Sequence, residues 1–307
     1  MDNPFYQSDL ISTKEMTLDQ VNLIMDTADK MKNKTHLSLL ANKIIASCFF
    51  EPSTRTRLSF ESAAHRLGAQ IIGFSEEDSL SIKKGETLSD TIRVIDFFAD
   101  LIILRHHQEG SAQLAAEVAT HPIINAGDGA NQHPTQALLD LYTIKSCQSV
   151  LDGLSIALVG DLKYSRTVHS LLNLCALFDV RLYFVSPVSL SLPDTLCNML
   201  KTKSIRFSFH TTPNEVINKI DILYMTRIQQ ERFSQAEYQL VKNQYILTNA
   251  LLKKAKSNLK ILHPLPRVNE IAREIDQTPY AYYFQQAQNG LWVRKAILSL
   301  ILNEKIP

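Results

Sequence analysis

The sequence predicts an α/β protein made of two doubly wound lobes, each a mainly parallel sheet flanked by helices. Short apolar runs alternate with amphipathic segments of helical length, which is the pattern of βαβ units. The 307 residues exceed what one hydrophobic core usually serves, and a prior of one domain per roughly 150 residues suggests two lobes. There is no internal repeat, low-complexity tract or long Gly/Ser linker.

The first half of the chain contains four apolar runs of strand length with helical segments between them. We expect strands near residues 43–50, 70–74, 100–104 and 122–126. A helix, "PTQALLDLYTIKS" at 134–146, then leads into the second half. There, strands are expected near 155–159, 181–185, 205–209, 221–225 and 259–262, and the segment "NGLWVRKAILSLIL" at 289–302 is expected to form a closing helix.

Composition excludes several classes of protein. Lys and Arg number 32 against 31 Asp and Glu, so the net charge of +1 creates no overall field that would recruit nucleic acid or an anionic membrane. Five charged residues in the first twenty argue against a signal peptide, and no apolar run approaches the roughly 18 residues of a membrane span. The four cysteines have no C-x-x-C or zinc-ligand spacing, which favours reduced core thiols. A soluble cytoplasmic protein is expected.

Cationic and polar residues follow the predicted strands of both lobes. In the first lobe these are Glu51 with "PSTRTR", Arg105 with His106, and "GDGANQHPTQ" with His133 and Gln136. In the second they are "GDLKYSR" with Asp161 and Arg166, "TRIQQER" with Arg227, Gln229 and Arg232, and "HPLPR" with His263 and Arg267. Parallel sheets bind ligands at the carboxyl ends of their strands, and arginine offers a planar fork of donors to phosphate or carboxylate. The pattern indicates a ligand with several negative charges.

Each of these motifs also has a purely structural interpretation. In that interpretation the hydroxyl residues of "STRT" simply cap a helix. Capping does not explain Arg55 and Arg57 at the positive end of a helix dipole, where an anion would be needed. A single histidine such as His133 is more often packed than catalytic, although the glycines and Pro134 around it mark a tight turn that would aim it. "GDLKYSR" lacks the second and third glycines of a dinucleotide-binding turn.

Seven motifs, taken in order, resemble those of the catalytic chains of the aspartate carbamoyltransferase family. They are "STRTR", "KKGETLSDT", "LRHHQEG", "NQHPTQALLDLYT", "GDLKYSRTVHSL", "MTRIQQERF" and "HPLPR", and they cover nearly the whole chain. The resemblance implies transfer of the carbamoyl group of carbamoyl phosphate to the amine of L-aspartate, an early step of pyrimidine synthesis. It also implies an active site in the cleft between the lobes, with no metal and no organic cofactor.

The resemblance assigns a role to each matching residue. Ser53, Thr54, Arg55 and Thr56 would hold the phosphate, helped by Arg105, while Thr56, Arg105 and His133 would surround the carbamoyl oxygen. Gln136 and the backbone carbonyls of Pro264 and Leu265 would accept hydrogen bonds from the carbamoyl amide. Lys84, Arg166, Arg227 and Gln229 would hold the aspartate carboxylates, and Glu51 would bridge the lobes through Arg166 and Arg232. Arg55, Thr56, Arg105 and His133 are the expected catalytic residues.

The resemblance also implies domain roles and an assembly. Residues 1–133, closed by the helix 289–307, would bind carbamoyl phosphate, and residues 134–288 would bind aspartate. Lys84, with Ser79 or Ser81, would reach the site of a neighbouring chain in a homotrimer; whether separate regulatory chains also associate stays open. The rival interpretations are an ornithine carbamoyltransferase, a catalytically dead relative and a dinucleotide-dependent dehydrogenase. The first is disfavoured by "HPLP", where ornithine enzymes usually have "HCLP", and by the lysine of "KKGE".

Overall fold

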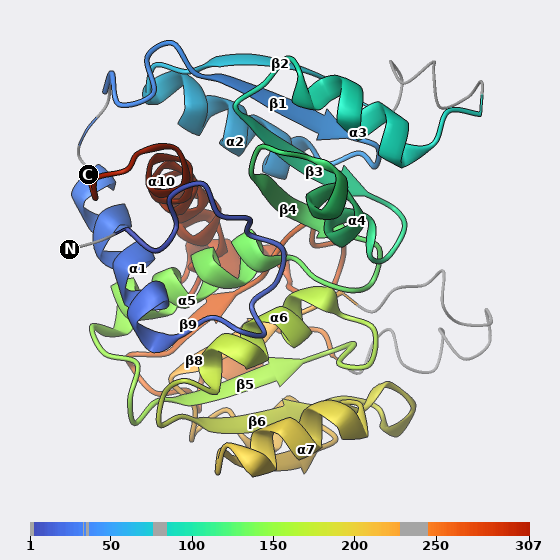
Figure 1. Cartoon of the computed structure of the whole chain (residues 1–307). Helices are drawn as coiled ribbons and strands as arrows, with labels where there is room; N and C mark the ends of the chain where they lie inside the picture. Colours follow the sequence, from blue (N-terminus) through green and yellow to red (C-terminus); the bar gives the residue numbers. More distant parts are fainter. Residues whose placement is uncertain (1–2, 33, 35–36, 76–84, 228–244) are drawn as a thin grey trace. The chain divides into compact units, whose positions relative to one another are not determined.

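The computed structural model of the chain describes residues 3–32, 34, 37–75, 85–227 and 245–307. The chain divides into two compact units. Unit 1 comprises Met1–Leu139 together with Gln288–Pro307, and unit 2 comprises Asp140–Ala287. Each unit contains one parallel sheet with helices packed against it (Figure 1). The fold class predicted from the sequence is confirmed.

Unit 1 is built on a sheet with the strand order β2-β1-β3-β4, in which every neighbouring pair is parallel. The strands are β1 (Ile44–Phe49), β2 (Gln70–Ser75), β3 (Leu101–His106) and β4 (Ile123–Asp128). The helices are α1 (Leu18–Lys32), α2 (Thr54–Arg66), α3 (Leu88–Asp96) and α4 (Ser111–Val118). The chain runs from β1 outward to β2 and then returns past β1 to β3. The winding direction therefore reverses between β1 and β3, which makes this pair the topological switch point of the sheet.

The strands β1, β3 and β4 are buried on both faces, which explains why they read as continuous apolar runs, whereas the edge strand β2 is largely exposed. Ala46 and Cys48 of β1 pack in one cluster with Ile92 of α3 and Ala115 of α4. Neighbouring residues of a strand point to opposite faces, so the alternate residues of β1 face the other side of the sheet. All six residues of β3 are buried.

The C-terminal helix α10 (Tyr283–Leu302) anchors two other helices of unit 1. The guanidinium of Arg294 lies 4.9 Å from the centre of the Phe60 ring on α2. The buried ammonium of Lys295 donates to the carbonyl oxygens of Met31 and Lys34, at 3.0 and 2.5 Å, where α1 ends. A cation is favourable at the C-terminus of a helix, because the last carbonyl groups there have no partner within the helix.

Unit 2 is built on a second parallel sheet, with the order β7-β6-β5-β8-β9. Its strands are β5 (Ser155–Val159), β6 (Arg181–Val185), β7 (Arg206–His210), β8 (Ile222–Met225) and β9 (Lys260–Leu262). Its helices are α6 (Arg166–Cys175), α7 (Asp194–Thr202) and α9 (Asn249–Leu252), with the short 3-10 helices η3 (Val188–Leu190), η4 (Pro213–Glu215) and η6 (Arg273–Gln277). Helix α5 (Pro134–Gln148) starts in unit 1 and continues into unit 2. Here the winding reverses between β5 and β8.

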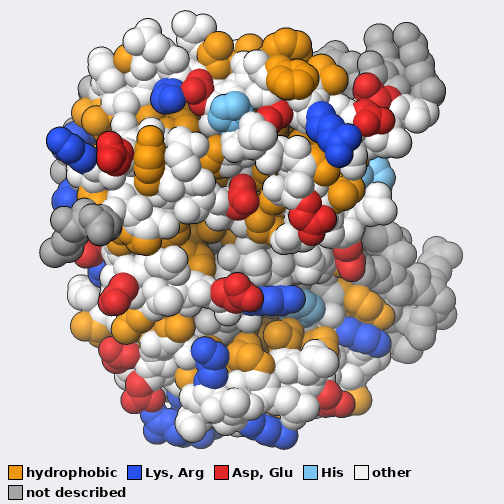
Figure 2. Space-filling model, viewed as in Figure 1, with side chains coloured by type: hydrophobic (Ala, Val, Ile, Leu, Met, Phe, Trp, Pro, Cys, Tyr) orange, Lys and Arg blue, Asp and Glu red, His pale blue; other side chains and the backbone are white. Residues whose placement is uncertain are grey.

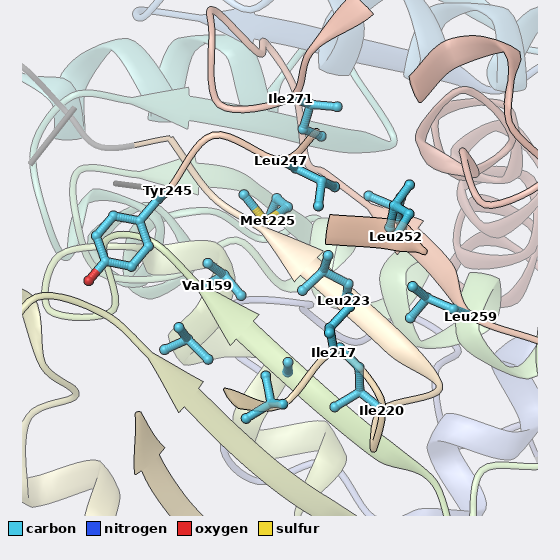
Figure 3. Close-up of a cluster of buried hydrophobic side chains, with 14 of the residues drawn as sticks. Val159, Ile217, Ile220, Leu223, Met225, Tyr245, Leu247, Leu252, Leu259 and Ile271 are labelled. Atoms are coloured by element: carbon cyan, nitrogen blue, oxygen red, sulfur yellow. The ribbon is translucent and has the colours of Figure 1, made fainter. Parts of the chain in front are cut away.

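One core cluster of unit 2 lies against the strands β5 and β8. Val159, Leu223 and Met225 from these strands meet Ile217 and Leu259 from the flanking connections (Figure 3). All of these side chains are buried to 1 % exposure or less. Burial of this kind stabilises the folded unit by about 1.5–3 kcal/mol for each large aliphatic side chain. The carboxyl ends of β5 and β8 are therefore supported by well-packed side chains.

The observed helices and strands agree closely with the expected ones, and the start of one helix and the burial of one cysteine differ. Helix α10 begins at Tyr283, earlier than the predicted 289, because its first turns, "YFQQAQ", carry polar residues that give no apolar period. Of the four thiols, three are buried as expected, but Cys147 is half-buried.

The distribution of surface charge and the apolar content of the helices agree with what the composition indicated. Basic and acidic side chains are interspersed on the face shown in Figure 2. Within the described ranges, none of the helices is both long enough and apolar enough to cross a membrane.

Candidate active site

The switch point of unit 1 brings the "PSTRTR" motif next to Arg105. Phe49, the last residue of β1, is paired with Arg105 of β3. The chain then passes Glu51 and enters α2 at Thr54, with Ser53 at the N-cap position. The first N–H groups of a helix lack acceptors within the helix and carry the positive end of its dipole. The thirteen-residue helix α2 therefore presents an anion-binding end beside a buried arginine.

Ser53 does not act as a capping residue. Its hydroxyl donates to the hydroxyl of Thr56 at 2.9 Å, and in the described part of the chain its side chain accepts no hydrogen bond from the helix backbone. The capping interpretation of the "STRT" residues therefore fails for Ser53. The contact instead holds Ser53 and the buried Thr56 side by side at the start of α2.

The two arginines of "STRTR" have different surroundings. Arg57 Nε lies 2.7 Å from Glu61 Oε1, one helical turn further along, and Ser47 of β1 donates to the same oxygen at 3.1 Å. Arg55 is exposed in the first turn of α2. The ion pair to Glu61 gives Arg57 a structural role, so Arg55 is the arginine suited to a ligand at this helix end.

Arg105 is held in place by two contacts within unit 1. Its Nη1 donates to the carbonyl oxygen of Ala126 in β4 at 3.1 Å, and its Nη2 lies 3.0 Å from Glu51 Oε2. The sequence interpretation paired Glu51 with Arg166 and Arg232 instead. Arg166 belongs to unit 2 and Arg232 lies outside the described residues, so that pairing stays a prediction.

A buried aspartate organises the turn that leads to His133. Asp128, which ends β4 and is 1 % exposed, accepts four hydrogen bonds. Its Oδ2 accepts from Gly110 N and Asn131 Nδ2 at 3.0 and 2.9 Å. Its Oδ1 accepts from Asn125 Nδ2 and Gln132 N at 2.9 and 3.0 Å. The residues from 128 to 132 are thus closed into one tight turn.

His133 follows this turn directly, as the residue before α5. Its carbonyl oxygen accepts from the backbone N–H groups of Gln136 and Ala137, at 3.1 and 3.2 Å, and Pro134 occupies the first helical position. Proline is favoured there because that N–H has no helical partner. His133 and Gln136 are both largely buried. The backbone of His133 is therefore held by the turn and by the start of the helix together.

We expect Asp128→Asn to lower both stability and activity. An amide would place an NH₂ group against two N–H donors, and each unsatisfied buried group costs about 1–3 kcal/mol. In thermal unfolding, Tm should fall by several degrees, and kcat should fall through misplacement of His133. Asp179→Asn on the exposed Arg206–Asp179 pair, with exposed side-chain fractions of 64 % and 71 %, is the matched control. Equal Tm values for the two variants would contradict the role given to Asp128.

In unit 2, Arg166 and Arg227 follow neighbouring strands. Gly160, the first residue after β5, has a φ of +115°, and a Cβ there would lie 2.5 Å from the carbonyl oxygen of Thr226, the first residue after β8. Only glycine allows these strand ends to approach so closely. Asp161 Oδ1 then accepts from the N–H groups of Lys163 and Tyr164, at 3.1 and 2.9 Å. This turn leads to Arg166, the first residue of α6.

The segment after β9 lies at the same sheet edge, since β8 and β9 are parallel neighbours. It contains Pro264 and Leu265, both half-buried. The sequence grouped Arg267 with the other cations that follow strands, but in the structure it forms an ion pair within unit 2. Its two terminal nitrogens each lie 2.5 Å from the carboxylate of Asp276, which also accepts from the hydroxyl of Tyr283. This ion pair corrects the view of Arg267 as a cation directed at the ligand.

The structure thus places the predicted residues in two groups. Unit 1 gathers Ser53, Thr54, Arg55, Thr56, Arg105, His133 and Gln136, and unit 2 gathers Arg166, Arg227, Pro264 and Leu265. Lys84, Gln229 and Arg232, like Ser79 and Ser81, lie outside the described residues. Sequence reasoning missed the organising role of Asp128. The only local signal for it was an Asx residue between two glycines, which is typical of a turn.

Both halves of the chain match one family of enzymes. Residues 8–146 match the aspartate/ornithine carbamoyltransferase carbamoyl-P binding domain, and residues 152–301 match the Asp/Orn binding domain of the same family. The aspartate carbamoyltransferase catalytic subunit of Vibrio campbellii is 54 % identical over 309 residues, which cover all of both chains.

Solved structures agree in fold. The aspartate transcarbamoylase of Trypanosoma cruzi in complex with carbamoyl phosphate superposes with a TM-score of 0.94 at 38 % identity, over 98 % of each chain. The catalytic subunit of the M. jannaschii aspartate transcarbamoylase gives a TM-score of 0.90 at 49 % identity, over 95 % of this chain and 97 % of that one. These identities extend over both units. The chain belongs to the aspartate/ornithine carbamoyltransferase family.

Proposed function

We propose that this chain is an aspartate carbamoyltransferase. It transfers the carbamoyl group of carbamoyl phosphate to the amine of L-aspartate, giving N-carbamoyl-L-aspartate and phosphate. The observation that carries this proposal is the anion-binding start of α2, with Ser53, Thr56 and Arg55, beside the buried Arg105 at the switch point of unit 1. It is supported by the 54 % identity to a catalytic subunit of this activity and by relatives solved with carbamoyl phosphate and with N-(phosphonacetyl)-L-aspartic acid.

Phosphate is held in unit 1 and leaves from there. Backbone N–H groups at the start of α2, the hydroxyls of Ser53, Thr54 and Thr56, and the guanidinium of Arg55 share its negative charge. Charge-assisted hydrogen bonds of this kind are roughly twice as strong as neutral ones. A phosphate stabilised in this way is a good leaving group.

The carbamoyl oxygen is stabilised by preorganised donors. Attack of the aspartate amine on the carbamoyl carbon builds negative charge on this oxygen, and Thr56, Arg105 and His133 donate to it. These bonds strengthen in the transition state, so they accelerate the reaction rather than only binding the substrate. Arg105 and His133 are held by the contacts to Ala126 and by the Asp128 turn, so they need little rearrangement during the reaction.

Aspartate is held in unit 2. Its two carboxylates require cations, which Arg166 and Arg227 supply at the adjoining ends of β5 and β8, with Lys84 and Gln229 as further contacts. Ornithine carries a side-chain ammonium in place of the second carboxylate, and this group would meet like charge here. The site therefore favours aspartate over ornithine.

The test mixes the purified protein with carbamoyl phosphate and either aspartate or ornithine. Phosphate release and the carbamoyl amino acid are measured together. We expect product with aspartate and none with ornithine. Turnover of ornithine at a comparable rate, or no turnover of aspartate, would reject the proposal.

Arg227→Ala should raise the aspartate KM strongly while leaving carbamoyl phosphate affinity nearly intact. Loss of a charge-assisted contact to a carboxylate costs about 1.5–3 kcal/mol, which is about 10- to 150-fold in affinity. Arg206→Ala, which removes an arginine at the opposite end of this sheet, is the control. Calorimetric titration checks the division between the ligands, and an equal loss for both would contradict it.

Three further features belong to the same proposal. Residues 1–133 with residues 289–307 bind carbamoyl phosphate, and residues 134–288 bind aspartate. The chain forms a homotrimer in which Lys84 completes the site of a neighbouring chain. The product enters pyrimidine synthesis in the cytoplasm, a location that stays a prediction from the sequence.

A further inference from the structure

We propose that His263 is a positioning residue, which holds the backbone carbonyls of Pro264 and Leu265 where they accept from the amide of carbamoyl phosphate. The inference rests on the proposed function and deepens it. It assigns a role to a buried histidine, 2 % exposed, that does not itself touch the substrate.

The hydrogen bonds of His263 determine which ring nitrogen carries its proton. The backbone N–H of Leu265 donates to His263 Nδ1 at 2.8 Å. An N–H group can only donate, so Nδ1 must be the unprotonated nitrogen of a neutral ring. The proton is then on Nε2, which donates to Glu270 Oε1 at 2.7 Å. The ring therefore acts as an acceptor on the loop side and as a donor on the opposite side.

Glu270 joins the other end of the same loop to this ring. Its Oε2 accepts from the backbone N–H groups of Val268 and Asn269, at 3.0 and 3.1 Å. Burial alone would raise the pKa of Glu270, but the hydrogen bonds from His263 and the N–H of Val268 lower it below its usual value, which keeps the carboxylate charged. The path from Leu265 through His263 and Glu270 to Val268 thus closes the loop 264–267 from both sides.

The backbone of His263 is fixed independently of its ring. Its N–H donates to Gln286 Oε1 on α10 at 2.8 Å, and Gln286 Nε2 donates to Asp140 Oδ1 on α5 at 2.6 Å. The other oxygen of Asp140 accepts from the Tyr224 hydroxyl at 2.7 Å. These contacts hold the backbone at the start of the loop. A substitution that changes only the ring therefore removes the bonds to Leu265 and Glu270 but keeps the bond from the His263 N–H to Gln286.

The loop needs such support because Leu265 has a φ of +57°. This left-handed conformation is unfavourable for a leucine. The bond from its N–H to His263 compensates for it. Without that bond the carbonyls on both sides of this residue would move, and a displacement of about 1 Å in a catalytic site can cost about 100-fold in rate.

The test compares two substitutions that each keep one half of the ring's function. In His263→Asn, the amide oxygen lies near the place of Nδ1 and can still accept from Leu265, but the contact to Glu270 is lost. In His263→Gln, the amide nitrogen lies near the place of Nε2 and can still donate to Glu270, but the acceptor for Leu265 is lost. His263→Gln should therefore impair the positioning of the loop more, and His263→Asn should lower the stability of the protein more.

We expect His263→Gln to have the lower kcat/KM for carbamoyl phosphate, by about tenfold relative to His263→Asn. The inhibition constant of inorganic phosphate, which contacts unit 1, should stay at the wild-type value in both variants. The order should reverse for stability: Tm should be lower for His263→Asn, by about 5 °C, because Glu270 loses its buried partner. A ring that only fills space would give the same ranking for activity as for stability.

A kcat/KM for His263→Gln equal to or above that of His263→Asn would overturn the inference. Glu270→Gln provides a second test should either variant fail to fold. It keeps an acceptor for His263 but turns an NH₂ group toward the N–H groups of Val268 and Asn269, so the KM for carbamoyl phosphate should rise while phosphate inhibition is unchanged. An unchanged KM would also overturn the inference. If the wild-type protein did not carbamoylate aspartate in the assay, the proposed function itself would be rejected, which is a different outcome.

Discussion

Arg55→Ala should lower kcat/KM by about 100- to 1000-fold, as expected for a group that stabilises charge in the transition state. The guanidinium belongs to the first turn of α2, and in the proposed reaction it shares the charge of the phosphate both in the bound substrate and as it leaves. Both the affinity for carbamoyl phosphate and kcat should therefore fall. Steady-state kinetics, together with calorimetric titration of carbamoyl phosphate, would measure the two effects.

Two comparison variants make the Arg55 result specific. Arg57→Ala removes the same charge two residues further along α2, where Glu61 already engages it, and should change kcat/KM by about fivefold at most. His133→Ala should lower mainly kcat, because its bond strengthens in the transition state. If kcat stayed within about twofold while the substrates bound normally, His133 would be a structural residue, since one such donor is worth about 2.7–4 kcal/mol.

Mixing two inactive variants, Lys84→Ala and His133→Ala, should restore activity. Each is expected to be nearly inactive as a homotrimer. If Lys84 serves a neighbouring chain, a hybrid trimer contains an interface where a His133→Ala chain lends its Lys84 to a Lys84→Ala chain that has an intact His133. That site has every wild-type contact, so the gain over both parents should be large, at about one competent site per hybrid trimer by symmetry.

The experiment unfolds and refolds the two variants together and assays the mixture. Native mass spectrometry establishes that hybrids have formed, and each variant refolded alone is the control. Hybrids that show only the parental activity would mean that Lys84 acts within its own chain, and the shared-site part of the proposal would fail.

Most of the strands could be predicted from the sequence because they are buried on both faces, whereas the edge strands β2 and β7 have no buried residue. A strand such as β3, with six buried residues, reads as an apolar run whatever surrounds it. The motif from Ser53 to Arg57 is equally visible, because its residues are consecutive and its charges conflict with a helix start that has no anion; its role in holding phosphate stays a prediction. The first turns of α10 were missed, because residues such as Gln286 face buried polar partners that lie far away in the sequence.

The supporting contacts of the site could not be predicted, since they depend on tertiary structure. The contact of Glu51 with Arg105 on the neighbouring strand gave no signal in the sequence, and the bridge from Glu51 to Arg166 and Arg232 stays a prediction. Likewise, Asp128 collects donors from residues 110 to 132, and Glu270 meets His263 only once the loop has turned. Sequence patterns indicate which groups contact a ligand, but they contain little signal for the buried polar groups that hold those residues in place.

The path of α10 has a consequence for the order in which the chain folds. Unit 2 is one continuous segment, Asp140–Ala287, whereas unit 1 needs both ends of the chain. Asn3 donates to the carbonyl oxygen of Leu300, and Lys295 closes the end of α1. On the ribosome, unit 1 is synthesised first but cannot be completed until the last helix emerges. Unit 2 can therefore reach its native state first, and the long-range contacts of unit 1 make it the slower part to fold and the one more exposed to aggregation.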